Sequence, residues 1–250
     1  MIGITSVLSS SALWRRLGLK RHNWPGRFTV LLVANVVLLV SQPMFSTHVF
    51  AQILTTVTIA LVLLAALYAF RLLRTYFIVA LILIVPAIGS RIALLFTPSP
   101  TIEMIGALSS CMFLAVTVFA LVSRLFTVTT VTVETISAAI CAYLLMGIGW
   151  AYAFAVLELR DPGAFSTMLF QRTVGHTAPL LASLHTFLYY SFVCLTTTGF
   201  GDISPVSEGA RSLSVMEAVF GQLFMAVLIA RLVGLQVAQS MRGENKGVED

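Results

Sequence analysis

Residues 196–202 combine the residue types that could bind a cation through the protein backbone. They read Thr-Thr-Thr-Gly-Phe-Gly-Asp. Glycine adopts a positive φ at little cost, so Gly199 and Gly201 allow a backbone that turns successive carbonyl oxygens toward one axis. Stacked rings of such oxygens can replace the water shell of a permeating cation. The predicted ion-binding residues are Thr197, Thr198, Gly199, Phe200 and Gly201, and the Thr197 hydroxyl would add oxygens at the inner end.

The composition of the chain indicates a membrane protein. Of its 250 residues, 58% are hydrophobic and only 10% are charged, whereas soluble domains are about a quarter charged. The net charge of +5 does not point to nucleic acid, because the basic residues lie mostly in short loops between apolar runs. We therefore expect membrane lipids as partners and no nucleic acid. The three cysteines lie in apolar runs, which favours free thiols over disulfides.

A membrane-spanning helix needs about 20 mostly apolar residues. Runs of this kind occur at 28–45, 49–70, 75–96, 102–124, 131–157 and 211–238. A shorter apolar run at 180–195 ends where residues 196–202 begin, so we expect a re-entrant half-helix there. The polar stretch at 158–179 is predicted to be an extracellular turret. The fold class is therefore an all-α membrane protein with six transmembrane helices and a re-entrant helix between the last two.

The positive charges agree with six spans. With a cytoplasmic N-terminus, 11 of the 15 basic residues fall on the cytoplasmic side. The four on or near the outer side are Arg91, Arg160, Arg172 and Arg211. This asymmetry follows the positive-inside rule and places both termini in the cytoplasm. We read the apolar run after the basic N-terminus as a first spanning helix rather than a removed signal, because no convincing cleavage site follows it. The expected location is the plasma (inner) membrane.

Residues 196–202 resemble the potassium-channel pore, whose pattern is a pore helix followed by T-T-V-G-Y-G-D between two membrane helices. Thr196, Thr197, Gly199, Gly201 and Asp202 match that pattern. The tyrosine pair at 189–190 is similar to the family's aromatic pair in the pore helix, and Gly221 matches the hinge glycine of the inner helix. The close resemblance covers about 130–238. It is that of a bacterial-type six-helix subunit with one pore domain per chain.

The resemblance implies a potassium-selective filter in a homotetramer, since one chain would leave an ion half coordinated. Potassium ions would bind at Thr197, Thr198, Gly199 and Phe200, with no organic cofactor. Asp202 and Glu208 would add negative charge at the outer mouth. Aligned on Gly221, the residues that would line the cavity and inner passage are Gln222, Met225, Ile229 and Val233. Passive conduction involves no covalent chemistry, so we do not expect an enzyme.

Two departures from the family pattern leave the degree of selectivity open. Thr198 replaces valine or isoleucine, and in the family this side chain faces the pore helix, so its hydroxyl needs a partner there. Phe200 replaces tyrosine and lacks the hydroxyl that would bond to the surrounding aromatic residues. The alternatives are therefore a weakly selective sodium and potassium channel, or a pore-like receptor or scaffold that does not conduct. A secondary transporter would usually show paired broken helices in two related halves, and none is evident.

The predicted organisation has four parts. These are a basic cytoplasmic segment at 1–27, a four-helix transmembrane domain at 28–125, a pore domain at 126–240 and a short cytoplasmic tail at 241–250. The second part resembles a voltage-sensor domain in number of helices, but its fourth helix carries only Arg124. One interfacial arginine would sense a small fraction of the roughly 2.3 kcal/mol per 100 mV available to a charge crossing the whole field. We therefore expect little voltage gating, and the gating stimulus remains open.

Overall fold

The computed structural model describes residues 27–44, 74–97, 99–167 and 180–246. Its helices are α2 (Arg27–Met44), α4 (Arg74–Phe96), α5 (Pro100–Thr127), α6 (Val133–Arg160), α8 (Leu180–Leu195) and α9 (Glu208–Lys246). Its two strands, β1 (Phe165–Thr167) and β2 (Ile203–Pro205), form one antiparallel pair. Apart from this short pair, the regular secondary structure of the described residues is therefore α-helical.

Five of the six predicted spans correspond to α2, α4, α5, α6 and α9, and the span at 49–70 lies outside the described residues. The half-helix predicted at 180–195 is α8, with the same bounds. The inner helix runs longer than predicted, from Glu208 to Lys246 rather than over 211–238. Hydropathy could not predict this, because the added residues at both ends are mostly polar and a helix need not stop at the edge of a membrane.

Within the described residues, three helices are long and apolar enough to cross a membrane by length and composition. They are Pro100–Thr127, Val133–Arg160 and Glu208–Met241. These helices mark an all-α integral membrane protein. The count of six spans and the re-entrant course of α8 remain predictions.

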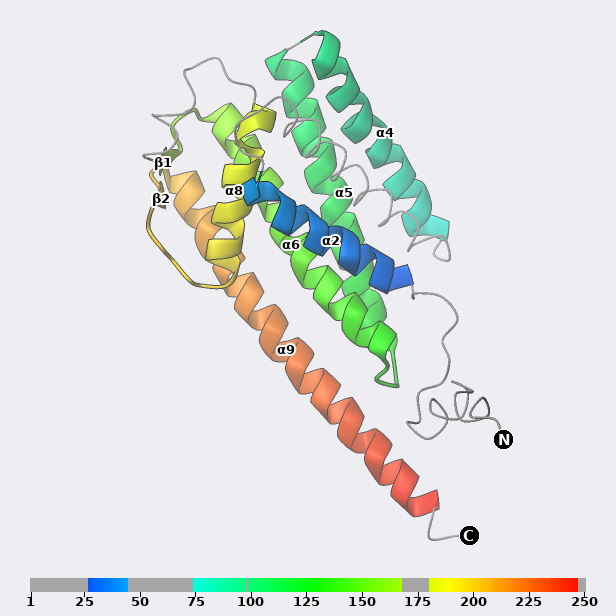
Figure 1. The fold of residues 1–250 in the computed structure, drawn as a ribbon. Helices are drawn as coiled ribbons and strands as arrows, with labels where there is room; N and C mark the ends of the chain where they lie inside the picture. Colours follow the sequence, from blue (N-terminus) through cyan, green and yellow to red (C-terminus); the bar gives the residue numbers. More distant parts are fainter. Residues whose placement is uncertain (1–26, 45–73, 98, 168–179, 247–250) are drawn as a thin grey trace, which may run out of the picture.

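Helix α6 is the central element, since it packs against α2, α5, α8 and α9 (Figure 1). Its buried face includes Leu145, Ile148 and Tyr152. Helices α4 and α5 pack as a pair on one side of α6, and the buried Arg91 guanidinium of α4 donates a hydrogen bond to the Tyr152 hydroxyl. The long helix α9 extends well beyond the end of α6 (Figure 1). Helix α6 thus joins the first helices to the elements around residues 196–202.

The strand pair is a correction to the predicted turret, which was expected to be a loop throughout. Strand β1 lies inside it and pairs with β2 in the register Phe165 with Pro205 and Thr167 with Ile203. The Glu158 carboxylate accepts hydrogen bonds from the backbone N–H groups of Gly163 and Phe165. Three-residue strands are too short to show an alternating pattern, so they could not be predicted from the sequence. The pair braces the chain immediately after residues 196–202.

Candidate functional site

Residues 196–202, called the filter segment below, leave the end of α8 with their N–H groups turned back toward the helix. The backbone N–H of Thr196 donates to the Phe192 carbonyl at 3.0 Å. The N–H of Thr197 donates to Cys194 and that of Thr198 to Val193, both at 2.9 Å. These bonds satisfy carbonyls that the last turn of a helix otherwise leaves without partners. They also direct the N–H groups of residues 196–198 toward α8 and away from any ligand.

The backbone of the filter segment has a positive φ at every second residue. The values are 62° at Gly199 and 79° at Gly201, as the sequence predicted, and 56° at Thr197. Thr197 was not expected here, because a positive φ is unusual for a β-branched residue and costs roughly 1–3 kcal/mol. A conformation that alternates in this way is what aims consecutive carbonyls in one direction.

The carbonyl oxygens of the filter segment are open on one side. Within the described part of the chain, those of Thr197, Thr198, Gly199 and Phe200 accept no hydrogen bond. All seven residues of the segment are exposed in the single chain. Unpaired carbonyls are tolerated at membrane depth only where protein buries them or a water-filled path runs past them. The filter segment is therefore incomplete without further oxygen or water on its open side.

The Thr198 hydroxyl finds the partner that the sequence required. Thr196 Oγ1 donates to the Phe192 carbonyl at 2.6 Å and lies 2.8 Å from Thr198 Oγ1. Because the single Thr196 hydrogen goes to Phe192, Thr198 is the donor in the second bond. The extra hydroxyl relative to valine is thus hydrogen-bonded next to the end of α8 and leaves no unsatisfied group.

Phe200 contacts the aromatic pair of α8 through its ring instead of a hydroxyl. Its ring stacks on Tyr189, with centroids 6.4 Å apart and planes 3° apart. The Tyr189 side chain also interacts electrostatically with Asp202. Tyr189 is therefore near both the aromatic residue and the carboxylate of the filter segment, although Phe200 itself remains 69% exposed.

Helix α9 contacts the filter segment near the end that follows α8. Gln222 Nε2 donates to Thr197 Oγ1 at 3.5 Å, so the predicted cavity residue contacts the innermost predicted ion site. The other predicted pore-lining residues are exposed in the single chain: Met225, Ile229 and Val233. In the most apolar 18-residue stretch of α9, only 6% of the residues are buried within the described chain. A membrane helix that is so exposed presents a large surface for assembly or for lipid.

Gly221 lies where α9 closely approaches the end of α8. A Cβ at this position would lie 2.6 Å from the Leu195 carbonyl oxygen and 2.9 Å from Leu195 Cδ1. The same carbonyl accepts a hydrogen bond from the Tyr143 hydroxyl of α6 at 3.3 Å. Helix α9 continues without a break through Gly221, so the predicted hinge role remains a prediction. What the structure adds is a close approach of α9 to the residue that precedes the filter segment.

The two carboxylates predicted to lie at an outer mouth are both exposed. Asp202 ends the filter segment, and Glu208 lies in the first turn of α9. Ser207 caps that turn, since its Oγ accepts from the N–H of Ala210. A carboxylate near a helix N-terminus is stabilised by the helix dipole. One exposed carboxylate therefore ends the filter segment and the other begins α9.

Sequence reasoning missed the aromatic cluster that holds the turret to α8. Phe165 of β1 is buried and makes edge contacts with Phe154, Phe187 and Tyr190, at centroid distances of 5.4, 5.5 and 5.3 Å. In the sequence, the only indication of this cluster is an aromatic residue in an otherwise polar stretch. The cluster packs the outer part of α8 against α6 and β1.

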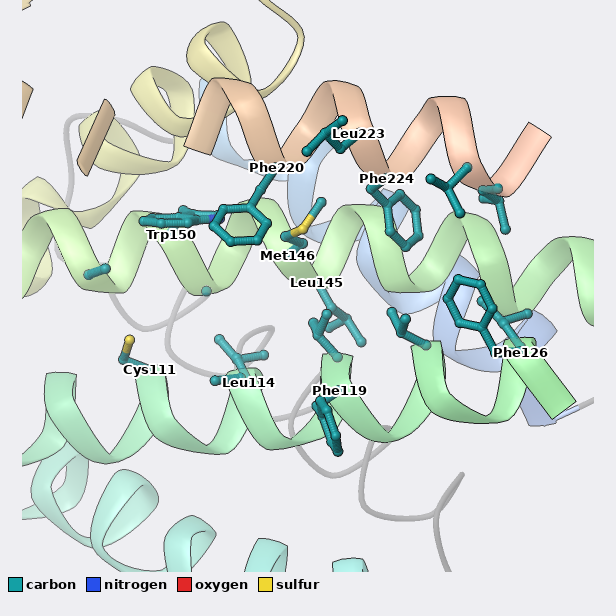
Figure 2. Close-up of a pocket in the computed structure, with 18 of the residues that line it drawn as sticks. Cys111, Leu114, Phe119, Phe126, Leu145, Met146, Trp150, Phe220, Leu223 and Phe224 are labelled. Atoms are coloured by element: carbon teal, nitrogen blue, oxygen red, sulfur yellow. The ribbon is translucent and has the colours of Figure 1, made fainter. Parts of the chain in front are cut away.

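A separate apolar cavity of about 620 Å³ lies between α5, α6 and α9 (Figure 2). Phe119 of α5, Trp150 of α6 and Phe220 of α9 are among its walls, and none of its lining residues is a carboxylate. Arg231 lines it too and donates to the carbonyls of Leu125, Phe126 and Val128, at the end of α5 and just after it. From its place in an apolar run near the inner end of α9, Arg231 is expected only to reach the membrane surface. The structure instead shows that it joins α9 to the end of α5.

The chain is similar to one protein family and to two known proteins over part of its length. Residues 163–236 match a family described as ion channel. A 77-residue segment is 34% identical to the voltage-gated potassium channel Kch of Escherichia coli (strain K12), covering 28% of this chain and 18% of that protein. A 91-residue segment is 29% identical to protein LctB of Bacillus caldotenax, covering 36% of this chain and 64% of that protein. The matched segments span less than two thirds of either relative, and no solved structure is significantly similar to the chain.

The family match falls on the elements that build the site. Residues 163–236 include β1, α8, the filter segment, β2 and most of α9. The resemblance to potassium channel pores that the sequence suggested is therefore confirmed for this part of the chain.

Proposed function

We propose that the chain is one subunit of a homotetrameric potassium channel, in which potassium ions pass through four filter segments arranged around one axis. The observation that carries this proposal is the run of four carbonyl groups, Thr197 to Phe200, that accept no hydrogen bond within the described chain. The backbone N–H groups of residues 196–198 are bonded to α8, and carbonyl oxygens without hydrogen-bond partners are suited to bind cations.

Fourfold assembly accounts for the two surfaces that a single chain leaves open. Around a common axis, the filter carbonyls of four subunits would coordinate dehydrated ions. The exposed face of α9 with Gln222, Met225, Ile229 and Val233 would line the inner passage. Asp202 and Glu208 would concentrate cations at the outer mouth. No nucleic acid or organic cofactor has a part in this proposal, and lipids surround the assembly.

In this proposal the channel lies in the plasma (inner) membrane with six spans per subunit and both termini in the cytoplasm. It is not strongly voltage-gated, because Arg124 and Arg91 are the basic residues of α5 and the described interior of α4. The match to Kch covers only 18% of that protein, so the voltage gating in its name carries no argument about α4 and α5 here.

Gly199→Ala tests the proposal, with Gly163→Ala as the matched control. Both glycines have a positive φ and open space around a Cβ, so alanine imposes backbone strain of the same kind at each. Only Gly199 lies in the filter segment. In liposomes or planar bilayers, Gly199→Ala should abolish potassium current while the tetramer persists, and Gly163→Ala should conduct. Equal current in both variants would mean that ions take another path.

A further inference from the structure

Glu217 is a buried carboxyl group behind the filter segment, on the face of α9 that meets α8 and α6. Its side chain is fully buried. Ser191 of α8 lies between two oxygens: its Oγ is 2.5 Å from Glu217 Oε1 and 2.6 Å from the Gly147 carbonyl of α6. Three helices therefore meet at one serine hydroxyl, immediately before the residues whose carbonyls anchor the filter N–H groups.

Both contacts of Ser191 have the length of hydrogen bonds, but serine has one hydroxyl hydrogen. A backbone carbonyl and an ionised carboxylate are both acceptors only. If Glu217 were ionised, Ser191 could donate to one of them, and the other short contact would join two groups without a hydrogen between them. If Glu217 carries a proton, it donates to Ser191 Oγ and Ser191 donates to Gly147, so both contacts are hydrogen bonds.

The surroundings of Glu217 also favour the neutral acid. Within the described residues, Glu217 Oε2 has no hydrogen-bond partner. The titratable side chains that interact with Glu217 are Tyr143 from α6 and Tyr190 and Cys194 from α8. None of these supplies a positive charge. A buried carboxylate with no cation and one unpaired oxygen is costly, whereas a neutral carboxyl in the same place loses much less.

We propose that Glu217 is protonated at neutral pH and acts as a positioning residue that joins α9 to α8 and α6 through the chain of hydrogen bonds Glu217 to Ser191 to Gly147. A second bond reinforces it next along α8, because the Tyr190 hydroxyl lies 2.7 Å from Ser214 Oγ, which donates to the Ala210 carbonyl. Helix α9 thus holds two adjacent residues of α8. Because α8 carries the filter anchors, a motion of α9 acts on the filter through these bonds.

The protonation state can be measured without any current. In wild-type protein carrying glutamate labelled with ¹³C at the side-chain carboxyl, solid-state NMR at pH 7 should show one protonated glutamate. That signal should be absent from Glu217→Gln. A spectrum of wild-type protein in which every glutamate is ionised at pH 7 would overturn the inference, whether or not the protein conducts.

The positioning role rests on the proposed channel function, and paired variants test it. Glutamine keeps a donor for Ser191 and carries no charge, whereas leucine has a similar size and no donor. Glu217→Gln should keep the potassium-to-sodium permeability ratio within about twofold of wild type, and Glu217→Leu should lower it by about tenfold. A glutamine variant as impaired as the leucine variant would show that the charge is required. If leucine prevents assembly, the NMR result still decides protonation. Absence of current from wild-type protein would count against the channel function alone.

Discussion

Gly221→Ala offers a strong test of how α9 supports the filter segment. The added Cβ would lie 2.6 Å from the Leu195 carbonyl oxygen, a backbone atom that cannot move without shifting the residue before Thr196. Overpacking of this kind costs about 1–3 kcal/mol, whereas alanine in place of glycine gains about 1 kcal/mol of helix propensity. The net change in stability should therefore range from about zero to a loss of about 2 kcal/mol.

Gly234→Ala is the matched control, because it makes the same substitution in the same helix where no atom lies within 4 Å of the added Cβ. It should gain up to about 1 kcal/mol, so the two variants should differ by about 1–3 kcal/mol. Thermal unfolding of the assembled protein measures that difference, and bilayer recordings measure permeability ratio and conductance. We expect Gly221→Ala alone to disturb both. If the two variants match in stability and in selectivity, the close approach at Leu195 has no importance for the filter.

Three further substitutions probe the contacts around the site. Thr198→Val removes one hydroxyl while Thr196 keeps its bond to α8. Conduction should therefore persist, and stability in thermal unfolding should fall by no more than about 1 kcal/mol. Loss of current would contradict this expectation. Phe200→Tyr should keep the stacking on Tyr189. Phe200→Leu should lose about 0.5–1.5 kcal/mol of stability and raise sodium permeability in bi-ionic recordings. Equal selectivity in the two variants would count against a role for the stacking. Arg231→Lys cannot reproduce a planar fork on three carbonyls and should lower stability by about 1–3 kcal/mol, so a thermal midpoint equal to wild type would refute that reading.

The sequence was sufficient to predict most of the helices, since long apolar runs leave few alternatives to a helix in a bilayer. It also predicted positive φ at Gly199 and Gly201, because glycine adopts that conformation most readily. The bounds of α8 followed from a short apolar run that ends at a threonine run. These features depend on residues close together in the chain.

The features that sequence reasoning missed depend on residues far apart in the chain. The cost of a charge in a membrane indicates that Glu217 faces protein, at the back of α8, but its partner Ser191 is 26 residues away and its residue type gives no sign of the contact. Arg231 lies over 100 residues from the carbonyls it binds, so its hydropathy context suggested only a side chain reaching toward the membrane surface. The positive φ of Thr197 was missed because residue type argues against it. Such contacts become visible only when the helices are packed.

Reversal potential in planar bilayers tests the ion pathway proposed for residues 196–202. With potassium on one side of the membrane and sodium on the other, the current through purified wild-type tetramers should reverse close to the potassium equilibrium potential. The current should also disappear in Gly199→Ala. Reversal near the sodium equilibrium potential, or near zero with equal permeability to both ions, would contradict the proposal that these carbonyls select potassium.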